Sequence, residues 1–209
     1  MTEIAIVDYG AGNLQSVRNA LEMAGEDPEI AATPEEILAA NRLVIPGVGA
    51  AGHAIGRMRE AGIDQALNEA IREKARPALG ICLGMQLAAA ALYEHGENDG
   101  LGWIAGDVKH LREVEGVPAR VPHMGWNEIE PADGTEELFD AVRGKRSFYF
   151  CHSYTLRAAP EDTIAATVAY GVPLVAAIRT GTFFATQFHP EKSQIKGQQL
   201  IEAFLEWKP

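Results

Sequence analysis

Apolar residues follow two different spacings in the first part of the chain. Short continuous apolar runs, typical of strands buried in a parallel sheet, occupy residues 3–8, 29–31, 42–45 and 78–82. Helical spacing appears at residues 14–23, after Thr33, between His53 and Ala75, and from Leu83 to about Tyr93. This β, α, β, α alternation predicts an α/β fold with flavodoxin-like layering, in which helices flank an open, twisted, mainly parallel or mixed sheet.

Individual residues add detail to these predicted elements. Thr33 followed by Pro34 is the pattern of a capped helix start. The strand at residues 42–45 is expected to stop at PGVG, residues 46–49, because glycine and proline do not continue strands well. The apolar side of the first predicted helix carries Leu14, Val17, Leu21 and Met23.

The pattern changes after about Leu101. Alternating segments separated by Gly, Pro and Asp indicate strands at residues 106–111, 123–131, 147–156, 163–170, 172–181 and 182–190. Helical spacing returns at residues 193–207, and no linker rich in Pro, Gly or Ser interrupts the chain. The sequence therefore predicts a single domain over residues 1–209, with an added β-rich region in its second half.

Composition and charge narrow the classes of function. The 209 residues are 47% hydrophobic and carry a formal net charge of −11, with no basic run to attract nucleic acid or an anionic membrane surface. No apolar stretch approaches the roughly 20 residues of a membrane helix, and the acidic amino terminus lacks a basic targeting region. The chain is expected in the cytoplasm. Its two cysteines suit neither a disulfide scaffold nor a structural zinc site, and we expect no metal and no cofactor.

The hexapeptide GICLGM, residues 80–85, is the strongest chemical signal. An apolar strand leads to Cys82, glycines flank it at positions 80 and 84, and a helical pattern follows, as in a nucleophile elbow. In such a turn the side chain is lifted clear of the sheet, and the following helix directs its positive end at the sulfur, which stabilises a thiolate. The alternative, a buried inert cysteine, fits Cys151 better, because that residue lies within an aromatic strand.

A cysteine nucleophile needs a base, and His189 is the best candidate. It ends an apolar strand just before a proline, so its ring should project from the edge of the sheet where α/β active sites form. Glu191 can lean back onto the imidazole and stabilise its charged form. His152 is the main competitor and is expected to be structural or to line the pocket. No neighbouring feature argues for catalysis by His53, His95, His110 or His123.

Acyl transfer also needs donors for the negative charge that develops on a carbonyl oxygen. The backbone N–H of Leu83, directly after the nucleophile, is one candidate. The PGVG turn is expected to supply a second, from Val48 or Gly49. Taken alone, that sequence is equally an ordinary turn.

Motifs along nearly the whole chain resemble those of the class I, triad-type glutamine amidotransferases. GICLGMQ and QFHPEKS are shared across many members of that family. DYGAGNL near the start, PGVG, and above all VPHMGWNEI at residues 121–129 are similar to one branch, the glutaminase subunits of imidazole glycerol phosphate synthase. The resemblance implies an amidotransferase-like fold and a reaction of Cys82 with the side-chain amide of glutamine, which gives a glutamyl thioester, ammonia and then glutamate.

The same resemblance implies a partner. In that branch ammonia passes to a (βα)₈-barrel cyclase subunit in a heterodimer, which makes imidazole glycerol phosphate and aminoimidazole carboxamide ribotide in histidine biosynthesis. By motif position, the residues that hold glutamine are Gly49, Gln86, Ser153 and Tyr154. Those that face the barrel are Asn13, Trp126, Tyr149 and Lys192. For Trp126, the alternative is that it caps the core of the β-rich region.

Two other functions remain open from the sequence. An amidotransferase subunit for anthranilate, guanylate or pyridoxal phosphate synthesis would carry a similar triad. HMGWN argues against it. A non-catalytic regulatory module on the same fold would normally have lost its nucleophile, and Cys82 is present.

Overall fold

A mixed sheet runs through the centre of the computed structural model, which describes residues 2–118 and 120–209. Its nine strands lie in the order β2 (Glu29–Ala31), β1 (Thr2–Val7), β3 (Ala40–Gly47), β4 (Ala78–Cys82), β13 (Phe183–Thr186), β12 (Val172–Thr180), β11 (Ile164–Tyr170), β8 (His123–Pro131) and β9 (Ser147–His152). The strands from β2 to β13 are parallel, and those from β13 to β9 pair antiparallel.

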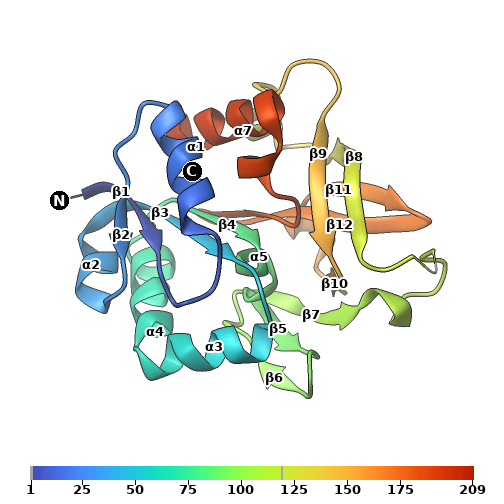
Figure 1. Ribbon diagram of the computed structural model, residues 1–209, viewed down its shortest axis with the longest axis horizontal. Coiled ribbons are helices and arrows are strands. Elements are labelled where there is room, and N and C mark those ends of the chain that lie inside the picture. Colours follow the sequence, from blue (N-terminus) through green and yellow to red (C-terminus); the bar gives the residue numbers. More distant parts are fainter. Residues whose placement is uncertain (1, 119) are drawn as a thin grey trace.

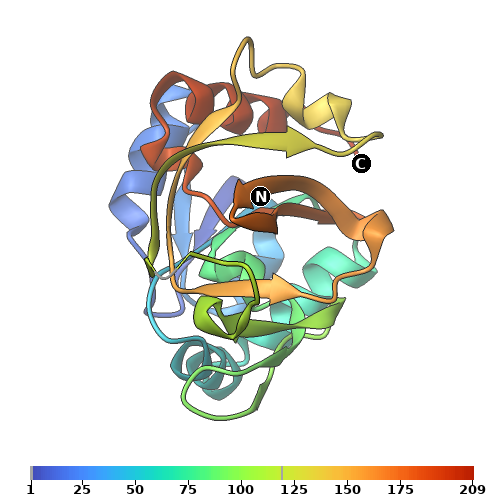
Figure 2. The ribbon, with the colours of Figure 1, turned by 90° about the vertical axis from the view of Figure 1, so that its right-hand side faces the viewer.

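A second sheet of four strands lies beside β12 (Figure 1). Its order is β10 (Tyr154–Arg157), β7 (Ile104–His110), β5 (Ala89–Leu92) and β6 (Asn98–Asp99). Figure 2 views the molecule from the side of the antiparallel strands and shows this β-rich half. The added β-rich region that the sequence predicts is therefore confirmed, although it contributes to two sheets.

Helices cover both faces of the parallel strands, as the alternating pattern predicts (Figure 1). On one face lie α1 (Leu14–Met23) and α7 (Gln194–Glu206), and on the other α2 (Pro34–Ala39), α3 (Ala51–Glu60) and α4 (Ile63–Asn68), which continues into a π-helical turn at Glu69–Glu73. The short elements are α5 (Leu83–Gln86), α6 (Glu136–Phe139) and 3₁₀ turns at Leu111–Glu113, Glu161–Thr163 and Pro190–Lys192.

Each face has its own hydrophobic core, because successive side chains of a buried strand point to opposite sides. In β3, Val44 packs with α1 and α7, whereas Ile45 packs with α2, α3 and α4. Thr33 caps α2 in a reciprocal pair with Glu36, which confirms the predicted start of that helix.

The predictions for Met23 and for the end of β3 are wrong. Met23 is 76% exposed, because it follows Leu21 by two positions, or about 200° around the helix, away from the side that Val17 and Leu21 bury. Strand β3 does not stop at residue 45 but includes Pro46 and Gly47, which pair with Ile81 and Cys82. Proline is tolerated there because it lies at the end of the strand and its carbonyl still accepts, from the hydroxyl of Tyr9 at 2.6 Å.

The helix predicted from Leu83 to Tyr93 is also wrong, because only its first turn forms, as α5. The alanine-rich segment that follows has a high helix propensity, yet Ala89–Leu92 pairs with β7 and β6 as strand β5. The pairing and the burial of Ala88 and Ala89 outweigh an intrinsic preference of a few tenths of a kcal/mol per residue.

No helix within residues 2–118 or 120–209 is both long and apolar enough to span a bilayer.

Candidate active site

Cys82 lies at the sharp turn between β4 and α5. Its backbone has φ 53° and ψ −102°, a region that residues with a side chain rarely occupy. A Cβ at Gly84 would lie 2.0 Å from the carbonyl oxygen of Ile45, and one at Gly80 would lie 2.8 Å from the ring of Phe183. Both flanking glycines are therefore required by close packing, as the elbow motif predicts. Since α5 is a single turn, its dipole stabilises the sulfur less than a long helix would.

His189 lies beside Cys82 because their strands are neighbours. β13 pairs in parallel with β4, with Thr186 opposite Ile81, so both chains leave the sheet at the same edge. The strand ends at Thr186, earlier than predicted, and His189 precedes a 3₁₀ turn at Pro190–Lys192. Its backbone N–H donates to the carbonyl of Tyr149 at 2.9 Å, which fixes this loop against β9.

The imidazole of His189 is held between the sulfur and a carboxylate. Its Nδ1 lies 2.7 Å from Oε1 of Glu191, and the two side chains are only 4% and 3% exposed. Burial alone would lower the pKa of His189, but the interactions of the imidazole with Cys82 and Glu191 outweigh burial and raise the pKa to about 10. The predicted Cys82, His189 and Glu191 are thus brought together, with the imidazolium stabilised from both sides.

A cavity of about 530 Å³ opens over the sulfur. It is lined by Val48, Gly49, Ala50, Cys82, Leu83, Gln86, Glu94, His110, Cys151, His152, Ser153, Tyr154, His189 and Lys192. All residues expected to hold glutamine are among them. The interpretation of Cys151 as a core residue is wrong: it is partly exposed and faces the same cavity. The expectation that His152 lines the pocket is confirmed.

The PGVG turn lies directly beside the nucleophile. Gly47 at the end of β3 is the pairing partner of Cys82, and Val48 and Gly49, which follow it, line the same cavity as the sulfur. Below the turn, burial and the nearby Cys82 and Asp8 raise the pKa of Tyr9, so its hydroxyl stays protonated and keeps donating to the chain at Pro46.

Two glutamines support the sulfur, and sequence reasoning identified only one of them. The side-chain Nε2 of Gln187 lies 3.6 Å from Sγ of Cys82 and donates to it. Gln86 in turn donates through Nε2 to Oε1 of Gln187 and to the carbonyl of Tyr154, each at 3.0 Å. Gln187 could have been suspected, since it is a polar residue among the aromatic and small residues that lead to His189.

Comparison with known proteins assigns the chain to a family. The family model "Glutamine amidotransferase class-I" matches residues 5–207. The imidazole glycerol phosphate synthase subunit HisH of Rhodopseudomonas palustris is 45% identical over 215 residues, with 99% of each chain covered. That of Acinetobacter baylyi is 42% identical over 207 residues, again with 99% of each chain covered.

The chain belongs to the HisH family of class-I glutamine amidotransferases. The family predicted from the motifs is confirmed. Among solved structures, PurLQS from Thermotoga maritima has a TM-score of 0.74 at 16% identity, covering 99% of both chains. A further glutamine amidotransferase has a TM-score of 0.74 at 21% identity, covering 97% of both chains. At these identities the two structures show the fold alone, and they confirm the predicted fold class.

The residues expected to face a partner lie at three places on this HisH-family chain. Trp126 and Tyr149 are opposite each other on β8 and β9, with ring centroids 6.0 Å apart. Trp126 is 47% exposed, so about half of its side chain is open to a partner. Lys192 is exposed at the cavity, and Asn13 caps α1 by accepting from the N–H of Ser16.

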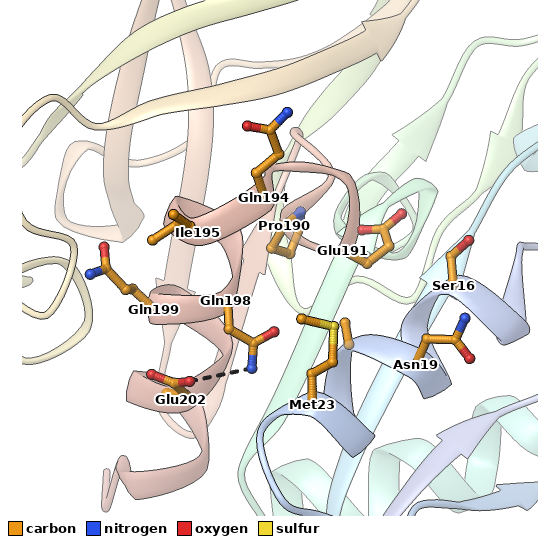
Figure 3. Close-up of a pocket in the computed structure, with 11 residues that line it drawn as sticks. Ser16, Asn19, Met23, Pro190, Glu191, Gln194, Ile195, Gln198, Gln199 and Glu202 are labelled. Atoms are coloured by element: carbon orange, nitrogen blue, oxygen red, sulfur yellow. Dashed lines mark hydrogen bonds between the residues drawn. The ribbon is translucent and has the colours of Figure 1, made fainter.

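A second groove, of about 620 Å³, lies behind Glu191 between α1 and α7 (Figure 3). Met23 of α1 and Ile195 of α7 line it, together with several side-chain amides, but no cysteine or histidine of the described chain does. Although this groove is larger than the cavity over Cys82, its lining has no thiol beside an imidazole, so we assign the chemistry to the smaller cavity.

Proposed function

We propose that the chain hydrolyses glutamine to glutamate and ammonia, with Cys82 as nucleophile, His189 as acid and base, and Glu191 as the group that orients His189. The observation that carries this proposal is the shared cavity of the sulfur and the imidazole, with the carboxylate 2.7 Å behind the ring. A charged imidazole beside the sulfur favours the thiolate, which is the reactive form of cysteine.

In the first half of the reaction, the thiolate attacks the side-chain carbonyl carbon of glutamine and a carbon–sulfur bond forms. The carbonyl oxygen becomes negative, and we assign its stabilisation to the backbone N–H of Leu83 together with Val48 or Gly49. The imidazolium of His189 gives its proton to the amide nitrogen, the carbon–nitrogen bond breaks, and ammonia leaves.

In the second half, neutral His189 takes a proton from water, whose oxygen attacks the thioester carbon. The carbon–sulfur bond breaks and returns its electron pair to the Cys82 thiolate beside the imidazolium. The new side-chain carboxylic acid gives the second proton of the water to solvent and leaves as glutamate. Gly49, Gln86, Ser153 and Tyr154 line the cavity around this reaction, and we assign them to binding the α-amino and α-carboxylate groups of glutamine.

The ammonia is proposed to pass to a cyclase subunit. The relatives above are subunits of imidazole glycerol phosphate synthase, and we infer that this chain forms the same kind of heterodimer with a (βα)₈-barrel cyclase in histidine biosynthesis. Met124 and Trp126 project from one side of β8 and are 53% and 47% exposed, a surface suited to an apolar anchor. Two free cysteines suit the reducing cytoplasm, which we infer as the compartment.

The nucleophile is tested by two matched variants at the same cavity. Cys82→Ala should abolish release of glutamate from glutamine, while Cys151→Ala should retain activity within about threefold, because Cys82 is the cysteine that interacts with His189. Both are assayed with the cyclase subunit present, and circular dichroism checks the fold. Hydrolysis by the folded Cys82→Ala variant at the rate of the unmodified chain would refute the assignment.

The partner surface is tested separately by Trp126→Ala. We expect it to weaken the complex with the cyclase subunit by at least tenfold in Kd, since an exposed aromatic anchor contributes about 2 kcal/mol or more to an interface. Met23→Ala, on the exposed side of α1, is the control and should bind normally. If Trp126→Ala melts far below the unmodified chain yet forms the complex normally on gel filtration, Trp126 is a folding residue instead.

A further inference from the structure

A row of three polar side chains lies inside the β-rich half, on the side of β8 and β9 away from Trp126. Nδ1 of His123 lies 2.9 Å from Nε2 of His152, its partner across the two strands. Nε2 of His123 lies 2.9 Å from Oδ1 of Asn127. The ring of His123 is sandwiched between Phe150 and Tyr170, with centroids 4.7 and 4.0 Å away. Stacking on both faces and a polar partner at each nitrogen hold this ring in place.

The hydrogen-bond partners of this row show which ring nitrogens carry a proton. Nδ1 of His152 lies 2.7 Å from the carbonyl of Tyr154, which only accepts, so this nitrogen carries a proton. If His152 is neutral, its Nε2 is bare, and Nδ1 of His123 must donate to it. A neutral His123 then has a bare Nε2 that needs a donor, and Oδ1 of Asn127 is not one.

Two arrangements give every nitrogen of the row a suitable hydrogen-bond partner. Either the two imidazoles share a third proton and a positive charge, or the carboxamide of Asn127 makes a half-turn so that Nδ2 takes the place of Oδ1 with the same distance. Burial lowers the pKa of His152 to about 3, helped by the facing His123 and His189, and burial also lowers the pKa of His123. A third proton is therefore disfavoured at neutral pH, which favours the arrangement in which Asn127 turns its NH₂ group toward His123.

With that orientation every hydrogen bond of the row points the same way, from Asn127 through His123 and His152 to the carbonyl of Tyr154. Bonds aligned in this manner polarise one another. The carbonyl of Tyr154 also accepts from Gln86, which is joined to the sulfur of Cys82 through Gln187, so a single backbone oxygen ties the buried row to the nucleophile.

We propose that Asn127, as a hydrogen-bond donor, and the His123–His152 pair are positioning residues that fix the Tyr154 segment of the glutamine pocket. The inference deepens the proposed function and rests on it. Asn127 directly follows Trp126 on β8, and the two side chains project to opposite sides of that strand. A partner that shifts β8 at Trp126 therefore moves the first donor of the row, which is a physical route from the surface to the pocket.

The tautomers test the proton count directly, in the full chain and without any assay of activity. Nitrogen-15 NMR of the two rings at pH 7 should show both His123 and His152 neutral with the proton on Nδ1. Asn127→Asp offers only an acceptor, so it should draw a third proton onto the pair at the same pH. A doubly protonated ring in the unmodified chain, or a proton on Nε2 of His123, would overturn the assignment.

Kinetics in the complex with the cyclase subunit test the positioning role. Asn127→Leu should raise KM for glutamine about three- to tenfold, the factor expected for one lost buried hydrogen bond, with kcat changed less than twofold. Asn68→Leu, at an exposed asparagine of α4, is the control and should change neither. If Asn127→Leu only lowers the melting temperature and leaves KM unchanged, the row is structural.

The two proposals fail in different ways. If the unmodified complex does not hydrolyse glutamine, the proposed function falls while the NMR result still decides the proton count. If hydrolysis is normal and Asn127→Leu leaves KM unchanged, only the positioning role falls.

Discussion

Replacing Glu191 by glutamine tests the electrostatics of the site most directly. The substitution keeps the shape of the side chain and an acceptor oxygen for Nδ1 of His189, and it removes only the charge. The pKa of His189 is about 10, against an ordinary 6.5. At about 1.4 kcal/mol per pH unit, this difference corresponds to about 5 kcal/mol. Cys82 and Glu191 share that stabilisation, so we expect the loss of Glu191 to cost about 2–3 kcal/mol.

The sign of the pH dependence follows from the direction of the pKa change. A histidine whose pKa is raised on folding stabilises the folded chain fully below pH 6.5, and this stabilisation is lost as the pH rises through about 10. Glu191→Gln should therefore lower the free energy of unfolding by about 2–3 kcal/mol at pH 6 and by distinctly less above pH 10. Any cost of the buried amide itself is the same at both pH values and cancels from the comparison.

Urea unfolding at pH 6 and at pH 10.5 measures this difference, and glutamine hydrolysis supplies a second readout. We expect kcat to fall by up to about 10⁴, the loss that follows when the aspartate of a Ser-His-Asp triad is replaced by asparagine. Glu202→Gln makes the same change at the wall of the groove in Figure 3. It should alter neither the free energy of unfolding nor kcat. An equal loss of stability at the two pH values would show that the charge of Glu191 does not act on His189.

Three further substitutions have defined outcomes. Gln187→Leu removes the donor to the Cys82 sulfur and should slow alkylation of Cys82 by iodoacetamide about tenfold at pH 7; an unchanged rate contradicts this role. Gly84→Ala should cost more than about 3 kcal/mol in urea unfolding, because its Cβ would overlap a backbone oxygen, while Gly56→Ala in α3 meets no atom within 4 Å and should be neutral or stabilising; similar stabilities would contradict the packing argument. Arg42→Met removes two hydrogen bonds to carbonyls at the end of α7, of 3.1 and 2.7 Å, and should cost about 1–2 kcal/mol by the same method; an unchanged stability contradicts it.

Much of the local structure could be predicted from the sequence. Apolar spacing, caps and glycines act over a few residues, so they predict the first strand, the Thr33 cap and the elbow at Cys82 without knowledge of what packs against them. The family was also readable, because its motifs are contiguous stretches such as residues 80–86 and 187–193.

Interactions between residues far apart in the chain depend on how the strands and helices pack against each other. The segment 89–92 has a helical composition but is a strand, because β7 and β6 offer it hydrogen bonds that a propensity scale does not contain. Met23 is exposed and Cys151 faces the active-site cavity for the same kind of reason, since burial depends on the neighbours.

Gln187 and the His123–His152 pair are examples of contacts that local sequence patterns do not predict. Residues 82 and 187 meet because β4 and β13 are adjacent in the sheet, and residues 123 and 152 meet because β8 pairs with β9 in one register. A one-residue change of that register would turn a ring to the opposite side of its strand and break the row. The order of the residues decides which chemical groups are present and which local turns they occupy. Strand order and register, set by the burial of two opposite faces at once, determined which of those groups meet.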